Sequence, residues 1–245
     1  MKTLAIVSQK GGVGKTTIAV HIAVAAAKAG YSVAIIDLDP QATAAQWADW
    51  RGEGPRRGGE GADENADPNP VVVAAPHARL GPTLKEAEKM GVDLVILDSP
   101  PAADSAAVAA AKAADLVLIP TRASASDLHA IKTTAELVKV AQKPASVLLN
   151  AVPARANSLI EEVATVIHSL NLAIAPVCLV DRAALHHAVI NGRTAGEYEP
   201  LGKAADEVRA LYAWVCGRLD MPTRKKVEKP AKKVPAASEP LKGAA

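Results

Sequence analysis

The chain has 245 residues, of which 49% are apolar, with a net charge of +2, and this length suffices for one α/β domain with its own core. Aromatic side chains make up only 2% and Phe is absent, which argues against base stacking as a main activity. With two cysteines, no signal-peptide pattern and no apolar run of membrane-spanning length, the sequence excludes a disulfide framework and predicts a cytoplasmic protein.

Short apolar segments alternate with helical patterns along most of the chain. The expected strands are Thr3–Ser8, Ser32–Asp37, Val71–Ala74, Val92–Asp98, Leu116–Pro120, Ser146–Asn150 and Ala173–Leu179. The expected helices are Thr17–Ala29, Ala42–Arg51, Thr83–Met90, Ser105–Ala113, Asp127–Ala141, Ser158–Leu170, Arg182–Asn191 and Leu201–Leu219. Apolar strands separated by helices predict an α/β fold with a doubly wound, mostly parallel sheet and helices on both faces.

Two segments interrupt this alternation. Residues 52–70 are rich in Gly, Pro and acidic side chains, which predicts a mobile surface loop inserted in a domain that spans residues 1–220. Residues 221–245 carry seven Lys or Arg, two Asp or Glu and four prolines, which predicts a basic disordered tail. This tail either adds contacts to nucleic-acid phosphates or only improves solubility.

A glycine-rich segment follows the first strand and opens the first helix. It consists of Lys10, Gly11, Gly12, Val13, Gly14, Lys15, Thr16 and Thr17. Glycines let successive N–H groups turn toward phosphate oxygens, and the helix N-terminus adds partial positive charge. In such a loop Lys15 neutralises the β- and γ-phosphates of a nucleotide and the Thr16 hydroxyl completes a Mg²⁺ shell. Gln9 stands where the usual phosphate-loop pattern has Gly.

Polar side chains end three of the later strands. Asp37 and Asp39 follow the second strand, Asp98 ends an apolar strand before Ser99–Pro101, and Asn150 ends another. Open α/β sheets bind ligands at the carboxyl edge, so these side chains are candidates for the nucleotide site. Alternatively, the two aspartates form a helix-capping turn, and Asn150 merely terminates its strand.

The lysine at the start of the glycine-rich segment distinguishes a family. With Lys10 beside the loop, residues 1–219 resemble the ParA/MinD family of deviant Walker-type ATPases, and most of all the short ParA-type partition ATPases. The resemblance implies that Lys10 reaches the nucleotide of a second copy in a homodimer, as an arginine finger does in trans. Ser99–Pro101 resembles the loop that senses the γ-phosphate in this family.

The resemblance also assigns roles to the polar strand ends. It implies that Asp39 orients the attacking water, that Asp37 and Asp98 belong to the magnesium shell together with Thr16, and that Asn150 contacts adenine. The reaction implied is Mg²⁺-dependent hydrolysis of ATP to ADP and phosphate, with Lys10, Lys15 and Asp39 as the catalytic residues. Asp39 has too low an ordinary pKa to be an effective general base, so orientation of water is its expected role.

Several functions share this ATPase core. The first is segregation of plasmid or chromosomal DNA, in which the ATP-bound homodimer binds DNA nonspecifically at the nucleoid until a cargo- or centromere-bound adaptor stimulates hydrolysis. The same switch alternatively positions a protein cargo over the nucleoid. Membrane positioning is disfavoured, because Pro230, Pro235 and Pro240 would break an amphipathic helix in the tail. His186 and His187 have no neighbouring cysteine or acidic cluster and are interpreted as structural.

Overall fold

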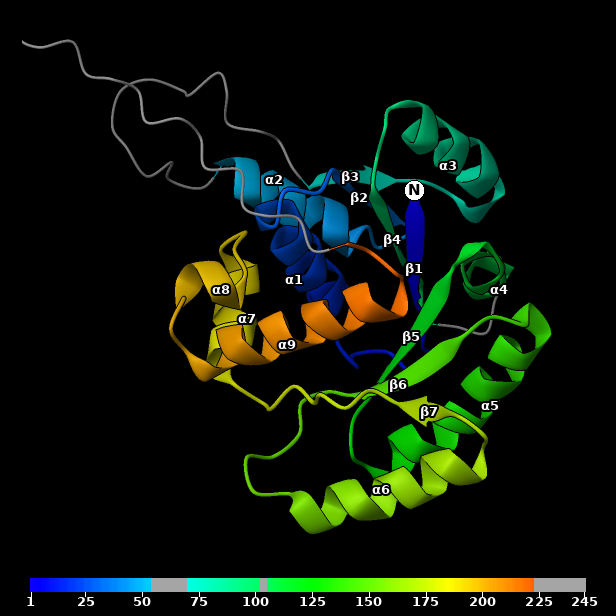
Figure 1. Cartoon of the computed structure of the whole chain (residues 1–245), viewed down its shortest axis with the longest axis vertical. Coiled ribbons are helices and arrows are strands. Elements are labelled where there is room, and N and C mark those ends of the chain that lie inside the picture. The colour runs from blue at the N-terminus through cyan, green and yellow to red at the C-terminus, as the bar shows by residue number, and fades with distance from the viewer. Residues whose placement is uncertain (54–69, 102–104, 223–245) are drawn as a thin grey trace, which may run out of the picture.

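A seven-stranded sheet, parallel throughout, forms the centre of the protein (Figure 1). The computed structural model describes residues 1–53, 70–101 and 105–222. The strands are β1 (Lys2–Ile6), β2 (Val33–Asp37), β3 (Val71–Ala74), β4 (Leu94–Asp98), β5 (Leu116–Thr121), β6 (Ala145–Leu149) and β7 (Ala173–Ile174). Their order is β3-β2-β4-β1-β5-β6-β7. The predicted fold class is therefore confirmed.

Helices cover both faces of the sheet, and the alternation of side chains along β1 explains why. Leu4 and Ile6 belong to one apolar cluster, whereas Ala5 and Val7 belong to the other. The first cluster is covered by α1 (Lys15–Lys28), α2 (Thr43–Glu53), α7 (Ala183–Ile190), α8 (Ala195–Tyr198) and α9 (Lys203–Arg218). The second is covered by α3 (Leu80–Lys89), α4 (Ser105–Ala113), α5 (Ala125–Ala141) and α6 (Asn157–Ser169).

The strand register brings the ends of the central strands together. Ile6 pairs with Asp98, and Asp37 pairs with Asp98 on the other side of β4. The chain leaves β1 toward β2 on one side, while β5 pairs with β1 on the other, so the order reverses beside β1. Such a reversal leaves a crevice at the carboxyl edge of an open parallel sheet.

The predicted elements differ from the observed ones mainly near the C-terminus. The strand expected at Ala173–Leu179 is wrong in length, since β7 has only two residues. Pro176 interrupts it because proline has no N–H to donate to the ladder. The chain continues beside β6 through the Leu179 N–H, which bonds the Leu149 carbonyl at 2.9 Å. The short helices α8 and η1 (His77–Arg79) were not predicted.

Parts of the two irregular segments fall outside the described residues. These are 54–69 of the predicted loop and 223–245 of the predicted tail. At the start of the predicted loop, Gly52 and Glu53 extend α2 instead. In the described ranges, each helix is too short or too polar to cross a membrane.

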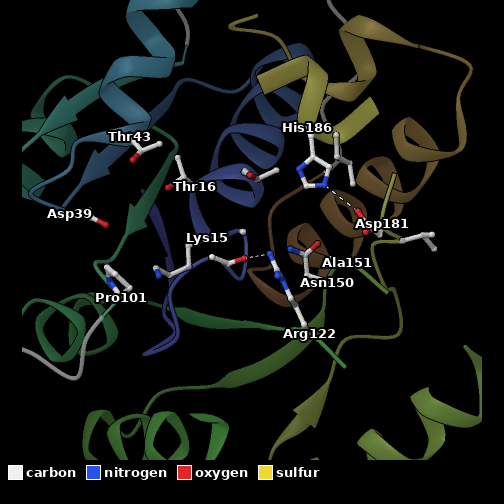
Figure 2. A pocket seen from close by; sticks show the side chains of 15 residues that line it. Lys15, Thr16, Asp39, Thr43, Pro101, Arg122, Asn150, Ala151, Asp181 and His186 are labelled. Atoms are coloured by element: carbon white, nitrogen blue, oxygen red, sulfur yellow. Dashed lines mark hydrogen bonds and ion pairs between the residues drawn. The ribbon is translucent and has the colours of Figure 1, made fainter. Parts of the chain in front are cut away.

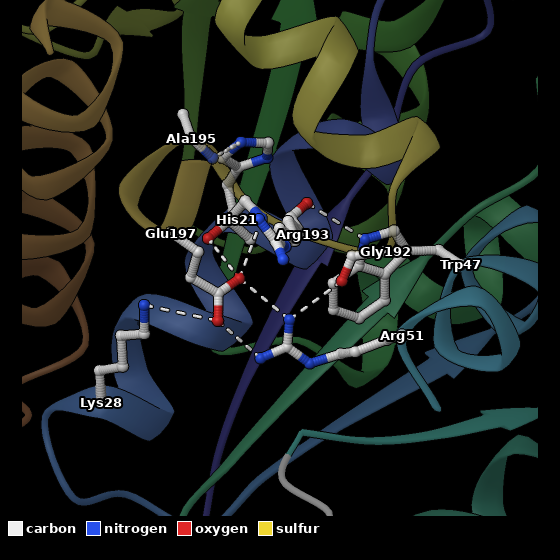
Figure 3. Close-up of polar contacts among 9 residues, drawn as sticks. His21, Lys28, Trp47, Arg51, Gly192, Arg193, Ala195 and Glu197 are labelled. Carbon is white, nitrogen blue, oxygen red and sulfur yellow. Dashed lines mark hydrogen bonds and ion pairs between the residues drawn. The ribbon is translucent and has the colours of Figure 1, made fainter. Parts of the chain in front are cut away.

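A polar network ties α8 to α1 and α2 (Figure 3). Arg51 donates to both oxygens of Glu197, at 2.8 and 2.9 Å, and Lys28 lies 3.4 Å from the same carboxylate. His21 accepts the Ala195 N–H at 2.9 Å through Nε2, so Nδ1 carries the proton that it donates to the Thr17 carbonyl at 2.7 Å. The network fixes the C-terminal helices against the helix that follows the glycine-rich loop.

Candidate nucleotide site

The loop between β1 and α1 has the backbone conformation that its glycines allow. Gly12 and Gly14 adopt positive φ angles of 72° and 89°. A Cβ on Gly14 would lie 2.3 Å from Asn150 Nδ2, so only glycine fits there. Gly14 is also the N-cap of α1 and provides no side-chain cap. The first N–H groups of α1 therefore lack the side-chain acceptor that usually caps a helix. Such unpaired N–H groups are what a phosphate-binding helix N-terminus needs.

Lys15 is the most deeply buried lysine of this loop. It is 8% exposed, and its Nζ lies 3.5 Å from the Lys10 carbonyl. Burial lowers its pKa, and the charges of Asp98 and Asp39 partly oppose that shift. A desolvated ammonium aimed at the phosphate loop interacts more strongly with an incoming anion than an exposed one.

Asp98 lies at the end of β4 next to the start of α1. Thr16 Oγ1 donates to Asp98 Oδ2 at 2.6 Å, while Asp98 Oδ1 is buried and has no partner among the described residues. Burial raises the pKa of Asp98 to about 7, although the Thr16 hydrogen bond and Lys15 oppose it.

The Thr16 hydroxyl and the orphaned Asp98 oxygen fit Mg²⁺, which binds through one or two carboxylates plus substrate phosphates. No group of three or more His, Cys, Asp or Glu side chains in the described ranges forms a metal cage by itself. A cation at this position would thus depend on the bound nucleotide for its other ligands.

The two aspartates after β2 have different surroundings. Asp37 is 1% exposed and accepts backbone N–H groups from Asp39 at 3.0 Å and Ala44 at 2.9 Å, which anchors the start of α2. Asp39 is half-buried and lines the cavity, where one of its oxygens accepts the Gln41 N–H at 2.9 Å. The capping turn considered from the sequence is therefore present at Asp37. The predicted metal role of Asp37 stays a prediction.

A cavity of about 340 Å³ lies beside the loop, and Lys15, Thr16 and Asp39 are part of its lining (Figure 2). Its predicted members are Gly12, Gly14, Lys15, Thr16, Thr17, Asp39 and Asn150, with Pro101 from the segment after β4. Lys10, Gly11 and Val13 complete the loop: Gly11 approaches Pro101, and Val13 is buried. The structure thus brings the predicted loop, Asp39, Asp98 and Asn150 together at one sheet edge.

The far wall of the cavity was missed from the sequence. It contains Arg122, Ala151, Asp181 and His186 (Figure 2). Thr43, Val180 and Leu185 also line the cavity and were missed, and Thr43 lies on the side of Thr16 and Asp39. His186, interpreted as structural, lies in this wall with Nε2 3.2 Å from Asp181 Oδ1 (Figure 2). Asn150 does more than terminate its strand, which was the simpler of its two expected roles. Its Nδ2 donates to the Val13 carbonyl at 2.7 Å. Only its position at the end of a strand could have indicated from the sequence that Arg122 lies at the site, since it directly follows β5.

Comparison with known proteins agrees with this geometry. Residues 4–194 match the family described as the CobQ/CobB/MinD/ParA nucleotide binding domain. Maintenance of carboxysome distribution protein A of Gloeobacter kilaueensis is 34% identical over 226 residues, covering 91% of this chain and 96% of that protein. The sporulation initiation inhibitor protein Soj of Bacillus subtilis is 27% identical over 243 residues, covering 84% and 94%.

Among solved structures, an ATP complex of a variant of McdA from Cyanothece has the same fold. Its TM-score is 0.65 with 20% sequence identity, and the match covers 91% of this chain and 97% of that one. The bound ATP belongs to that protein, and at this identity the likeness concerns the fold alone.

Proposed function

This chain belongs to the CobQ/CobB/MinD/ParA family of nucleotide-binding domains, and we propose that it is a Mg²⁺-dependent ATPase that dimerises on ATP and positions a protein cargo over the nucleoid. One observation carries the proposal that the chain is an ATPase. Lys15 is buried beside Thr16 and Asp98 at the N-terminus of α1, which has no side-chain cap. The similarity to a carboxysome-distribution protein supports a protein assembly as the cargo.

Each side chain of the site has a role in this proposal. Lys15 and the α1 N-terminus bind the phosphates, while Thr16 and Asp98 would hold Mg²⁺, which would supply positive charge beside the phosphate oxygens. Asp39 faces the cavity and orients the attacking water. Lys10 is half-buried at the start of the loop and reaches the nucleotide of the second copy. Hydrolysis then separates the two copies and releases the nucleoid.

A matched pair of aspartates tests the ATPase and the dimer together. Asp39→Ala removes the side chain that orients water, so we expect hydrolysis to fall by about 100-fold while ATP stays bound and the dimer persists. Asp49→Ala, on the exposed surface of α2, serves as the control and should behave as the natural chain. Light scattering with ATP, with ADP and without nucleotide measures the dimer. A monomeric Asp39→Ala protein in saturating ATP would contradict the switch.

DNA segregation is a second candidate, favoured by the similarity to Soj. Both candidates require nonspecific DNA binding that depends on ATP, so DNA affinity with ATP, ADP or no nucleotide tests their common step. Cells that lack the protein then separate the two. Clustered protein assemblies with normal plasmid and chromosome inheritance support the protein cargo, whereas loss of plasmids or chromosomes supports DNA segregation.

A further inference from the structure

Three carbonyl groups of the phosphate loop each accept a hydrogen bond from a side chain. The Lys10 carbonyl accepts from Lys15, the Val13 carbonyl from Asn150, and the Gly12 carbonyl from Nη2 of Arg122. Figure 2 shows Arg122 and Asn150 reaching the loop from the side of the cavity opposite Asp39. They follow β5 and β6, which lie next to each other in the sheet.

Holding a carbonyl also holds the next N–H group. In a planar trans peptide the C=O and the following N–H point in opposite directions, so the Gly12 carbonyl sets the direction of the Val13 N–H. In the same way the Val13 carbonyl sets the direction of the Gly14 N–H. Gly12 and Gly14 have positive φ angles, and glycine peptides rotate easily. Without an anchor, these N–H groups would sample directions that do not bind phosphate.

We infer that Arg122 is a positioning residue for nucleotide binding, which acts through the Gly12 carbonyl to preorganise the N–H groups of the phosphate loop. Donors that already point at the ligand need no reorganisation when it binds, and this preserves affinity. Asn150 anchors the next peptide in the same way. The inference deepens the proposed function and rests on it for the identity of the ligand.

Three arginine variants of the full chain test this role. Arg122→Met keeps an unbranched apolar stem but loses every donor, Arg122→Lys keeps a charged donor, and Arg218→Met removes an exposed arginine at the end of α9. We expect Arg122→Met to weaken Mg-ADP and Mg-ATP binding equally, by about tenfold, the loss of one charged hydrogen bond. Arg122→Lys should restore most of the affinity, and Arg218→Met should change nothing.

The alternative is direct contact between Arg122 and a phosphate. A direct contact with the γ-phosphate would make the loss larger for ATP than for ADP. That result overturns the positioning role, as does an unchanged affinity in Arg122→Met. Equal losses for both nucleotides support it.

Hydrogen exchange without nucleotide separates this inference from the proposed function. The backbone amides of residues 8–16 should exchange faster in Arg122→Met than in the natural chain, and Arg122→Lys should restore the slow rate. If the natural chain binds no nucleotide, the proposed function fails, yet faster exchange in Arg122→Met still supports the anchoring of the loop. If the natural chain binds nucleotide and Arg122→Met changes neither exchange nor affinity, the positioning role alone fails.

Discussion

The two ends of α1 carry polar clusters of opposite character. At its N-terminus, Lys15 and Asp98 are buried, and one Asp98 oxygen has no partner among the described residues. From the middle of the helix to its C-terminus, His21 uses both ring nitrogens, and Glu197, which Lys28 approaches, accepts from Arg51 with both oxygens. Buried polar groups are normally paired, so the incomplete cluster is the one where the proposed function places a ligand. The complete one holds the fold together.

The pKa values of the two clusters show the same contrast. Burial raises the pKa of Asp98 to about 7, and the nearby Lys15 offsets only part of that cost. Burial also acts on Glu197, but there the hydrogen bonds from Arg51 and the charge of Lys28 outweigh it and lower the pKa to about 2. The charged form of Asp98 in the first cluster is therefore only partly compensated by its neighbours, whereas the second cluster stabilises the charge of Glu197.

The largest expected effect comes from comparing two variants in which a lysine at either end of α1 is replaced by alanine. Lys15→Ala removes the buried cation at the phosphates, and we expect nucleotide affinity to fall by at least about a thousandfold, or about 4 kcal/mol. Lys28→Ala removes a lysine at the other end of the same helix, whose side chain is 54% exposed. Calorimetric titration with Mg-ADP and Mg-ATP measures both. Similar losses in the two variants would show that general positive charge, rather than the site, binds the nucleotide.

The next effect is a pH dependence of stability caused by His21. Burial lowers the pKa of His21 to about 4, whereas the unfolded chain has the ordinary value of 6.5. Between these values the unfolded chain binds a proton that the folded chain excludes. The stability that neutral His21 contributes should therefore be lost as the pH drops from 6.5 toward 4, by up to about 3 kcal/mol. Asp98 acts in the opposite direction over this range, because its pKa of about 7 in the folded chain lies above the ordinary value of 3.8, so the folded chain binds the extra proton.

Urea unfolding of the natural chain and of His21→Gln measures this dependence. The variant should be less stable than the natural chain near neutral pH, and this difference should shrink between about pH 6.5 and pH 4.5. Asp98 titrates in the same window in both proteins, so the difference between the two curves reports His21. Glu197 does not interfere in this window, because its stabilising charge is lost only as the pH falls from 4.5 toward its folded pKa of about 2. Parallel curves for the two proteins would contradict the assignment to His21.

The same contrast explains what was predictable from the sequence. Local patterns located the incomplete cluster, because a phosphate loop is a contiguous string, Asp39 follows one apolar strand and Asp98 ends another. The fold class followed from alternating apolar segments. The complete cluster was missed because Arg51 and Glu197 are 146 residues apart and meet only through packing.

Arg122 was missed for a related reason. Its function in the site depends on the register between β1 and β5, which pairs Leu4 with Leu116 and leaves the strand end beside the loop. The single residue Arg122 carries no spacing pattern of its own. The short helix α8 was equally invisible, since its four residues are held by the capping box of Thr194 and Glu197 instead of by helical periodicity.

The smallest expected effect tests whether the two clusters are independent. Arg51→Met leaves the carboxylate of Glu197, whose side chain is 18% exposed, without its bidentate partner and removes the contact with the Trp47 ring. We expect the free energy of unfolding to fall by about 2 kcal/mol. Adding Glu197→Gln should restore part of the loss, because it removes the uncompensated charge.

The Mg-ADP affinity of Arg51→Met tests whether the two clusters are independent of each other. We expect Arg51→Met to bind Mg-ADP as the natural chain does, within about twofold, since Lys15 and the loop carbonyls keep their contacts. However, Thr17 lines the cavity while its carbonyl bonds His21, so one residue joins the two clusters. A loss of affinity in Arg51→Met would mean that the C-terminal helices and the nucleotide influence each other through His21. In that event, the cluster of His21, Arg51 and Glu197 would not only hold the fold together but also take part in the proposed ATP-dependent switch.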